Sequence, residues 1–310
     1  MAARATRSAS GAASSRDGDS RCLLLALSHD ELGVIVDGLA DPLQPVVAVA
    51  LSSTCKGLRT PVVVKDARLI LMQRHWRAVA LCRKLDKSCL ELGDAEELKW
   101  QQKGLTSDDA ATLCMIVRTN GLRRLKRLYL RSNSLGDAGA QALCEGLDCD
   151  AAPSLRSLDL SDNQLGPAGA IALATALSRG AMPKLVTLFL SCNPFGNQGM
   201  VALAAPLHKM PALRMIHLSM CEIGDEGVAS LVDNLGKDDF KALEKLFLSS
   251  NKINDAGMST LVAAIDAGRL PKMISHTVRA PNLELHFLGR NPSSASAVQA
   301  VEDALAKRSS

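Results

Sequence analysis

The C-terminal two-thirds of the chain repeats itself, and this repeat limits the fold more than any other feature. Leu-x-x-Leu-x-Leu-like segments begin at Leu125, Leu155, Leu185, Leu213 and Leu243. Eight residues after each start stands asparagine, replaced once by Cys221, and a glycine follows six residues later in every copy. A worn copy precedes the five at Leu98, and another follows with Leu288 and Asn291. A fixed period of this length is typical of a solenoid built from stacked units.

Each unit contains two hydrophobic periods. Two leucines separated by one residue face the same side of a short strand. After the glycine, Leu143 and Leu147, and again Leu173 and Leu177, recur at a spacing of four, as on the buried face of a helix. The pattern predicts an α/β solenoid in which parallel strands form one sheet, helices form the outer layer and leucines fill the space between.

The asparagines and glycines of the repeat have structural interpretations. An asparagine amide both donates and accepts, so it can pair backbone groups that a buried turn would leave unsatisfied. We expect Cys221 to tie its own turn less well. The glycines suit a helix entry that packs closely on the strand. A phosphate-binding role is the competing interpretation, and their regular repetition disfavours it.

The motif LxxLxLxx(N/C)xLxxxG resembles the leucine-rich repeat in its long, ribonuclease-inhibitor-like form, over roughly residues 95–308. The resemblance implies a curved solenoid with the parallel sheet on its concave face and helices on its convex face. It also implies that the concave face serves protein recognition.

In this register, the residue four before the asparagine position points away from the core. The column contains four of the eight aromatic residues of the chain. We expect a partner-binding face formed by Tyr129, Arg131, Asp159, Phe189, His217, Phe247 and Phe287. Lys99 heads the same column, and mostly small hydroxyl residues fill the column beside it. The alternative is that the rings only stack along the sheet and stabilise neighbouring repeats.

A catalytic role for His217 is disfavoured, because an open sheet has no closed pocket that excludes water. We therefore expect no catalytic residue, no cofactor and no metal site. The nine cysteines are scattered without a Cys-x-x-Cys pair, which favours reduced thiols in a cytoplasmic protein, with the nucleus as the alternative compartment.

Residues 22–94 lack the repeat and form a predicted helical module. Ser28 and Glu31 form a capping box that opens a helix. The segment resembles an F-box, and the resemblance implies docking on the linker subunit of a cullin ubiquitin ligase. The residues that we expect to dock are Leu27, Glu31, Leu32, Ile35, Leu39 and Leu51. The alternative is a helical cap that only shields the first repeat.

Residues 1–21 are rich in Ala, Ser, Gly and Arg, and they predict a disordered tail, with an organelle-targeting segment as the alternative. The 36 Lys and Arg residues nearly balance 32 Asp and Glu residues. This balance argues against nucleic-acid or membrane-surface binding, and no apolar run is long enough to span a bilayer.

These observations predict a non-catalytic recognition protein that is a monomer on its own and binds a protein partner. If the F-box resemblance holds, the chain is a substrate adaptor of a cullin-type ubiquitin ligase. Two alternatives remain open. One is a regulator of a small GTPase, similar to the Ran GTPase-activating protein, and the other is an enzyme inhibitor similar to ribonuclease inhibitor.

Overall fold

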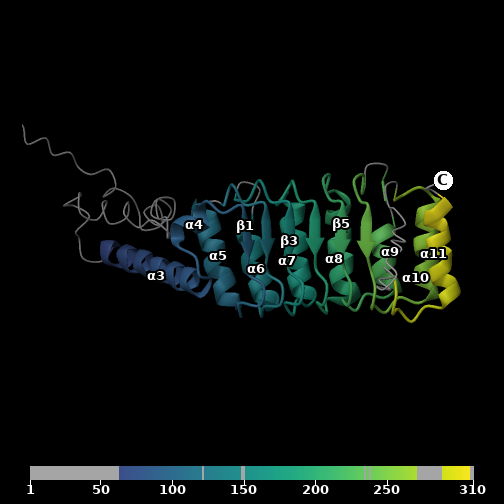
Figure 1. The fold of residues 1–310 in the computed structure, drawn as a ribbon, viewed down its shortest axis with the longest axis horizontal. Helices are drawn as coiled ribbons and strands as arrows, with labels where there is room; N and C mark the ends of the chain where they lie inside the picture. Colours follow the sequence, from purple (N-terminus) through teal and green to yellow (C-terminus); the bar gives the residue numbers. More distant parts are fainter. Residues whose placement is uncertain are drawn as a thin grey trace, which may run out of the picture.

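The computed structural model describes residues 63–120, 122–147, 151–233, 235–236, 239–270 and 288–307. Two helices, α3 (Val63–Lys84) and α4 (Cys89–Gly93), precede the repeats, and strands then alternate with helices along the chain (Figure 1). The alternating elements are β1 (Glu97–Lys99), α5 (Ser107–Asn120), β2 (Arg127–Tyr129), α6 (Gly136–Gly146), β3 (Ser157–Asp159), α7 (Pro167–Ser178), β4 (Thr187–Phe189), α8 (Gly196–His208), β5 (Met215–His217), α9 (Asp225–Val232), β6 (Lys245–Phe247) and α10 (Asp255–Asp266), followed by α11 (Ala295–Lys307).

The six strands form one parallel sheet in sequence order, β1 to β6. Each strand pairs with the next at equivalent positions of the repeat, so Leu98, Leu128, Leu158, Leu188, Ile216 and Leu246 stand in one line across the sheet. The helices pack in the same order, each from α5 to α10 against its successor and α10 against α11. The predicted α/β solenoid, with its sheet on the concave face, is confirmed.

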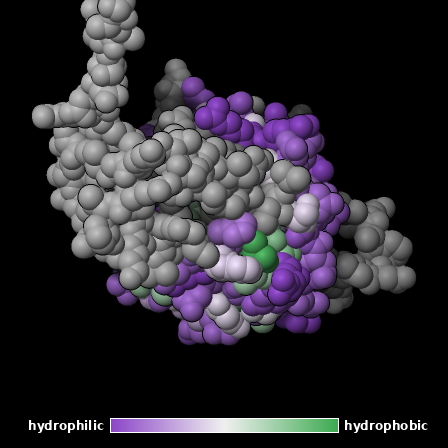
Figure 2. All heavy atoms as spheres, turned by 90° about the vertical axis from the view of Figure 1, so that its left-hand side faces the viewer, coloured by the Kyte–Doolittle hydropathy of each residue, from purple (hydrophilic) through white to green (hydrophobic). Residues whose placement is uncertain are grey.

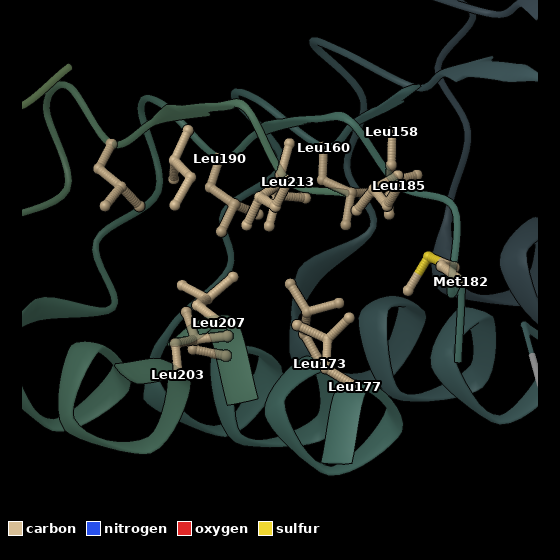
Figure 3. Packing of buried hydrophobic residues seen from close by; sticks show 14 of the residues in the cluster. Leu158, Leu160, Leu173, Leu177, Met182, Leu185, Leu190, Leu203, Leu207 and Leu213 are labelled. Atoms are coloured by element: carbon tan, nitrogen blue, oxygen red, sulfur yellow. The ribbon is translucent and has the colours of Figure 1, made fainter. Parts of the chain in front are cut away.

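The core lies between the strand layer and the helix layer. Leu158, Leu160 and Leu190 of the sheet side face Leu173 and Leu203 of the helices (Figure 3). All are at most 1% exposed, and they belong to one hydrophobic cluster that runs from Ala78 in α3 to Leu305 in α11. Neither layer could bury these leucines alone, and stacking the repeats removes them from water on both sides.

The asparagine at the end of each strand ties two neighbouring repeats together. The amide nitrogen of Asn193 donates to Leu190 O of its own strand and to Leu160 O of the strand before. Its Oδ1 accepts the N–H groups of Asn163 and Leu165 in the preceding turn. Asn133, Asn251 and Asn291 repeat this arrangement. These four asparagines therefore satisfy buried turns, as predicted. Asn163 donates in the same way through its amide nitrogen, but its Oδ1 is buried without a partner among the described residues.

The turn at Cys221 is held by other contacts. Its thiol donates to Leu190 O and Ser219 O, which replaces the amide donor, and Asn251 Oδ1 accepts from Cys221 N, so its own turn is well tied. The prediction of a weakened turn at Cys221 is therefore wrong. The preceding turn, in which Gly196 N donates to Cys221 O, resembles the one before Asn163, in which Gly136 N donates to Asn163 O.

Helix starts are capped by the neighbouring repeat. Asp137 Oδ1, in the first turn of α6, accepts the N–H groups of Gly166 and Gly169 at the start of α7. Asn197 serves the start of α9 in the same way, and Asp225 serves that of α10. The corresponding residue of α7 is Pro167, whose side chain has no oxygen. A carboxylate or amide at this position therefore satisfies the free N–H groups of the next helix.

Helix α8, which follows α7 and its Pro167, begins differently. Gly196, which opens α8, has φ +59, and its N–H donates to Cys221 O. Gly136, at the start of α6, has the same φ and donates to Asn163 O. Glycine enters this left-handed region without the steric cost that a Cβ would bring.

The repeated glycine is required both by its own repeat and by the repeat before it. A Cβ at Gly199 would lie 2.7 Å from Phe195 Cβ of the same repeat and 2.9 Å from Ala170 Cβ of α7, and one at Gly169 would lie 2.7 Å from Asp137 Oδ1 of α6. The glycine therefore allows close packing within its repeat, and it also makes room for the neighbouring helix and its cap.

At the N-terminal end, Ala78 and Leu81 of α3 and Leu85 directly after it join the core cluster, and α3 packs against α5 and α4. These helices cover the leucines of the first repeat, as the capping interpretation requires. Among the described atoms visible at this end, most are hydrophilic, with one small hydrophobic area (Figure 2). The predicted tail 1–21 and the F-box-like positions Leu27, Glu31, Leu32, Ile35, Leu39 and Leu51 lie outside the described residues.

Candidate functional site

The strand register places one residue of each repeat in a single line on the helix-free face of the sheet. We call Lys99, Tyr129, Asp159, Phe189, His217 and Phe247 the central row. Its members alternate with the buried leucines, so their side chains point away from the core. The row thus contains five of the seven residues expected on the binding face, Arg131 lies two residues beyond it on β2, and Phe287 lies outside the described part of the chain.

Three members of the central row, Phe189, His217 and Phe247, form a ring stack. The centroids of Phe189 and His217 are 4.5 Å apart with planes at 26°, and those of His217 and Phe247 are 4.1 Å apart at 13°. All three side chains are half-buried. Because the rings stack from strand to strand, both faces of His217 and one face each of Phe189 and Phe247 are covered.

The electrostatics of the ring stack are set by the burial of its central imidazole. Burial lowers the pKa of His217 from 6.5 to about 4, and the nearby Lys245 ammonium acts in the same direction. The imidazole is therefore neutral at pH 7. Its Nε2 is buried without a hydrogen-bond partner among the described residues. The ring stack is consequently an uncharged, mainly apolar surface.

Asp159 separates the ring stack from Tyr129. Its side chain is only 9% exposed, and Oδ1 accepts the N–H of Ser161 at 2.9 Å. The carboxylate therefore fixes the end of its own strand and offers little surface to a partner. Tyr129 is half-buried on β2.

Two further rows border the central row. Ser161, Ser191, Ser219 and Ser249 continue on one side, after Arg131, and Ser249 donates to Ser219 at 2.8 Å. On the other side stand the first strand residues, among them Thr187, Met215 and Lys245. This second border was not predicted from the sequence. The strand period of two would have identified it, because its residues stand two positions before those of the central row.

Charges are distributed unevenly over this face. On β1 and β2 the charges pair among themselves, since Glu97 binds both Arg127 and Lys99. Arg214 and Glu244 pair beside β5 and β6. Within the described residues, Arg131 and Lys245 form no ion pair, and they lie on opposite sides of the ring stack. The uncompensated charge bordering the rings is therefore positive at these two points.

The site has none of the arrangements needed for catalysis by His217. Asp159 is on β3 and His217 on β5, with Phe189 between them in the central row. Among the described residues, no group of three or more His, Cys, Asp or Glu side chains could hold a metal ion. Cys192 lies 3.7 Å from Met220 Sδ in the turns beyond the serines, and burial raises the pKa of its thiol.

The comparisons with known proteins agree with this geometry. A family model described as "Leucine Rich repeat" matches residues 122–144, 151–174, 181–204, 210–232 and 242–262. No helix in the described ranges has the length and apolar character needed to span a membrane.

Curated relatives share parts of the repeat region. "NACHT, LRR and PYD domains-containing protein 3" of Rattus norvegicus is 43% identical over 68 residues, which are 22% of this chain and 6% of that protein. Its Mus musculus counterpart is 41% identical over the same share. "Ribonuclease inhibitor" of Mus musculus is 32% identical over 127 residues, or 37% of this chain and 27% of that protein. The matches thus span less than a third of each relative.

Proposed function

Since the chain is a leucine-rich-repeat protein of the ribonuclease-inhibitor-like type, we propose that it is a non-catalytic recognition protein that binds a protein partner on its concave sheet. The observation that carries this proposal is the half-exposed ring stack on the open face of the sheet. Aromatic side chains are frequent energetic anchors of interfaces, and contiguous apolar patches on a surface mark interaction sites.

Stacking and binding are compatible roles for these rings. Ring contacts between neighbouring strands contribute about 0.2 to 1 kcal/mol each. They also hold the rings in one conformation before a partner arrives, which reduces the ordering cost of binding. The ring stack therefore supports a preformed binding face.

The proposal is tested by the double variant Phe189→Ala and Phe247→Ala in the full chain. We expect it to lose most of the partner protein that the unchanged chain captures from cell extract. The matched control is Ile171→Ala with Val201→Ala, which removes two apolar side chains that are 41% and 48% exposed on the convex helices α7 and α8. Equal capture by the ring variant, with loss in the control, would move the interface to the convex side.

We further propose that the partner is a substrate of a cullin-type ubiquitin ligase, for which this chain is the adaptor. The support is the F-box-like pattern in the module of residues 22–94, whose expected docking positions run from Leu27 to Leu51. Leu32→Asp with Ile35→Asp in the full chain should abolish co-purification of the ligase linker subunit and leave partner capture by the repeats intact. Unchanged co-purification, or none with the unmodified chain, contradicts the adaptor role.

Enzyme inhibition is a second candidate, favoured by the similarity to ribonuclease inhibitor. In that case the captured partner is an enzyme whose activity falls when it is bound. An activity assay of the captured partner, with and without the chain, separates inhibition from adaptor function.

A further inference from the structure

The rings and charges on the concave face restrict which partner can bind there. This inference rests on the proposed function. Two features carry it: the orientation of the ring stack and the positions of Arg131 and Lys245. The first determines what can lie on the rings, and the second determines which charge can lie beside them.

A partner that lies over the middle of the ring stack meets ring edges rather than ring faces, because both faces of His217 are covered, while Nε2 of His217 is buried. His217 stacks on Phe189 at one face and on Phe247 at the other. An aromatic ring has a negative face and a positive edge. The exposed edges therefore favour the face of another aromatic ring, packed edge-to-face, and they disfavour a cation, which binds to ring faces. The neutral imidazole adds no opposing charge.

Arg131 and Lys245 lie on a diagonal through the ring stack. Arg131 is two residues beyond the central row on β2, and Lys245 is two residues before it on β6. The midpoint of this diagonal is Phe189 on β4. With strands about 4.8 Å apart and about 3.3 Å per residue, each half measures about 12 Å. This length corresponds to about three to four residues of extended chain.

Two carboxylates that border this diagonal already have partners. Asp159 accepts the N–H of Ser161, and Glu244 pairs with Arg214. Asp162 is exposed in the turn beyond the serines. Neither Arg131 nor Lys245 has an ion-pair partner in the described part of the chain. A ligand with carboxylates can therefore pair with both cations without displacing an existing ion pair.

The dimensions of the face favour a segment over a folded domain. Six strands cover roughly 24 Å across the sheet, and the outward residues extend about 16 Å along each strand. Their product is well below the ~800 Å² that a globular partner covers in a standard interface.

We propose that the occupant is an extended acidic segment of a partner protein, which places an aromatic side chain on the ring stack and a carboxylate about four residues away on each side, so that all three side chains face the sheet. The aromatic ring packs on the edges of Phe189 and its neighbours. One carboxylate binds Lys245 and the other binds Arg131, in charge-assisted hydrogen bonds.

The test uses three fluorescein-labelled nonapeptides and the full chain, with binding followed by fluorescence polarisation. The probe is Glu-Ser-Ser-Ser-Trp-Ser-Ser-Ser-Glu. One comparison peptide replaces both glutamates by lysine, and the other replaces tryptophan by alanine. We expect the probe to bind at least about tenfold tighter than either comparison peptide, and its binding to weaken as ionic strength rises.

Surface variants connect the result to the two cations. Arg131→Ala with Lys245→Ala should weaken probe binding about three- to tenfold, and Lys245→Glu should reduce the preference for the acidic peptide over the basic one. Lys252→Ala is the matched control, because Lys252 is exposed and pairs with Glu222 away from the ring stack. It should leave probe binding unchanged. None of these side chains belongs to the hydrophobic core, so the variants are expected to fold.

The inference is overturned if the basic peptide binds as well as the acidic one, if none of the three binds, or if the cation variants bind the probe like the unchanged chain. Its failure is distinguishable from that of the proposed function. If the ring variant loses the cellular partner while the peptides show no acidic preference, the recognition role remains and the assigned chemistry is wrong.

Discussion

At the scale of single residues, His217 is the most unusual group on the concave face. Its ring is held between two phenylalanine rings, and burial keeps it neutral well below pH 6.5. In the unfolded chain, the imidazole accepts a proton at ordinary pH values near 6.5. Between these two values the unfolded state binds more protons than the folded state, so stability falls as the pH decreases from about 6.5 to about 4.

The variant His217→Phe should remove this part of the acid sensitivity. Its melting temperature is expected to fall less than that of the unchanged chain between pH 7 and pH 4, because phenylalanine has no proton to bind. Burial also lowers the pKa of His208, so His208→Phe provides the comparison for an imidazole away from the concave face. Parallel pH profiles for His217→Phe and the unchanged chain would show that the imidazole is readily protonated in the folded state.

At the scale of elements, the start of one helix depends on the first turn of the helix before it. Asp137, Asn197 and Asp225 each accept two N–H groups from the next helix. The connection from α7 to α8 lacks this contact, since Pro167 stands at the capping position and Gly196 adopts a positive φ. Neighbouring repeats are therefore joined by polar contacts as well as by the core.

Asp137→Ala tests this contact. Loss of the cap from α7 should lower the free energy of unfolding by about 1 to 2 kcal/mol, measured by urea denaturation. Asp266→Ala changes the same charge at the exposed end of α10 and should have little effect. A similar loss of stability in both variants would mean that net charge, rather than capping, is responsible.

Much of this architecture could be predicted from the sequence, because its causes are periodic. The leucines identify the buried side of every strand and helix, and the asparagines identify the turns. The capping contact could not be predicted in the same way, since it joins Asp137 to residues of another repeat. The missed border around Met215 and Lys245 was readable from the strand period. The bonded state of Asp159 was not, because it depends on the local turn that presents Ser161 N.

At the scale of the whole molecule, the hydrophobic core is continuous from α3 to α11. Leu188, at its centre on β4, is fully buried. Trp100, near the first repeat, belongs to the same cluster and is 2% exposed. A defect in the middle of the array is therefore expected to affect its ends.

Leu188→Ala should reduce the free energy of unfolding by about 2 to 5 kcal/mol, because it leaves a cavity in this core. Unfolding is best followed by circular dichroism and by tryptophan fluorescence in a Trp76→Phe background, which leaves Trp100 as the reporter. Both signals should shift together. Ile171→Ala, at an exposed position, is the control. Separation of the two transitions would mean that the repeats unfold in independent groups.

The central row also selects a partner by spacing. Its residues are about 4.8 Å apart, and from Lys99 to Phe189 no two neighbours are of the same kind. A bound segment shifted by one strand would exchange an aromatic neighbour for Asp159 on one side or leave Phe247 uncovered on the other. The molecule can therefore reject a segment that has suitable groups in the wrong spacing, so that spacing is a criterion of selection in addition to composition.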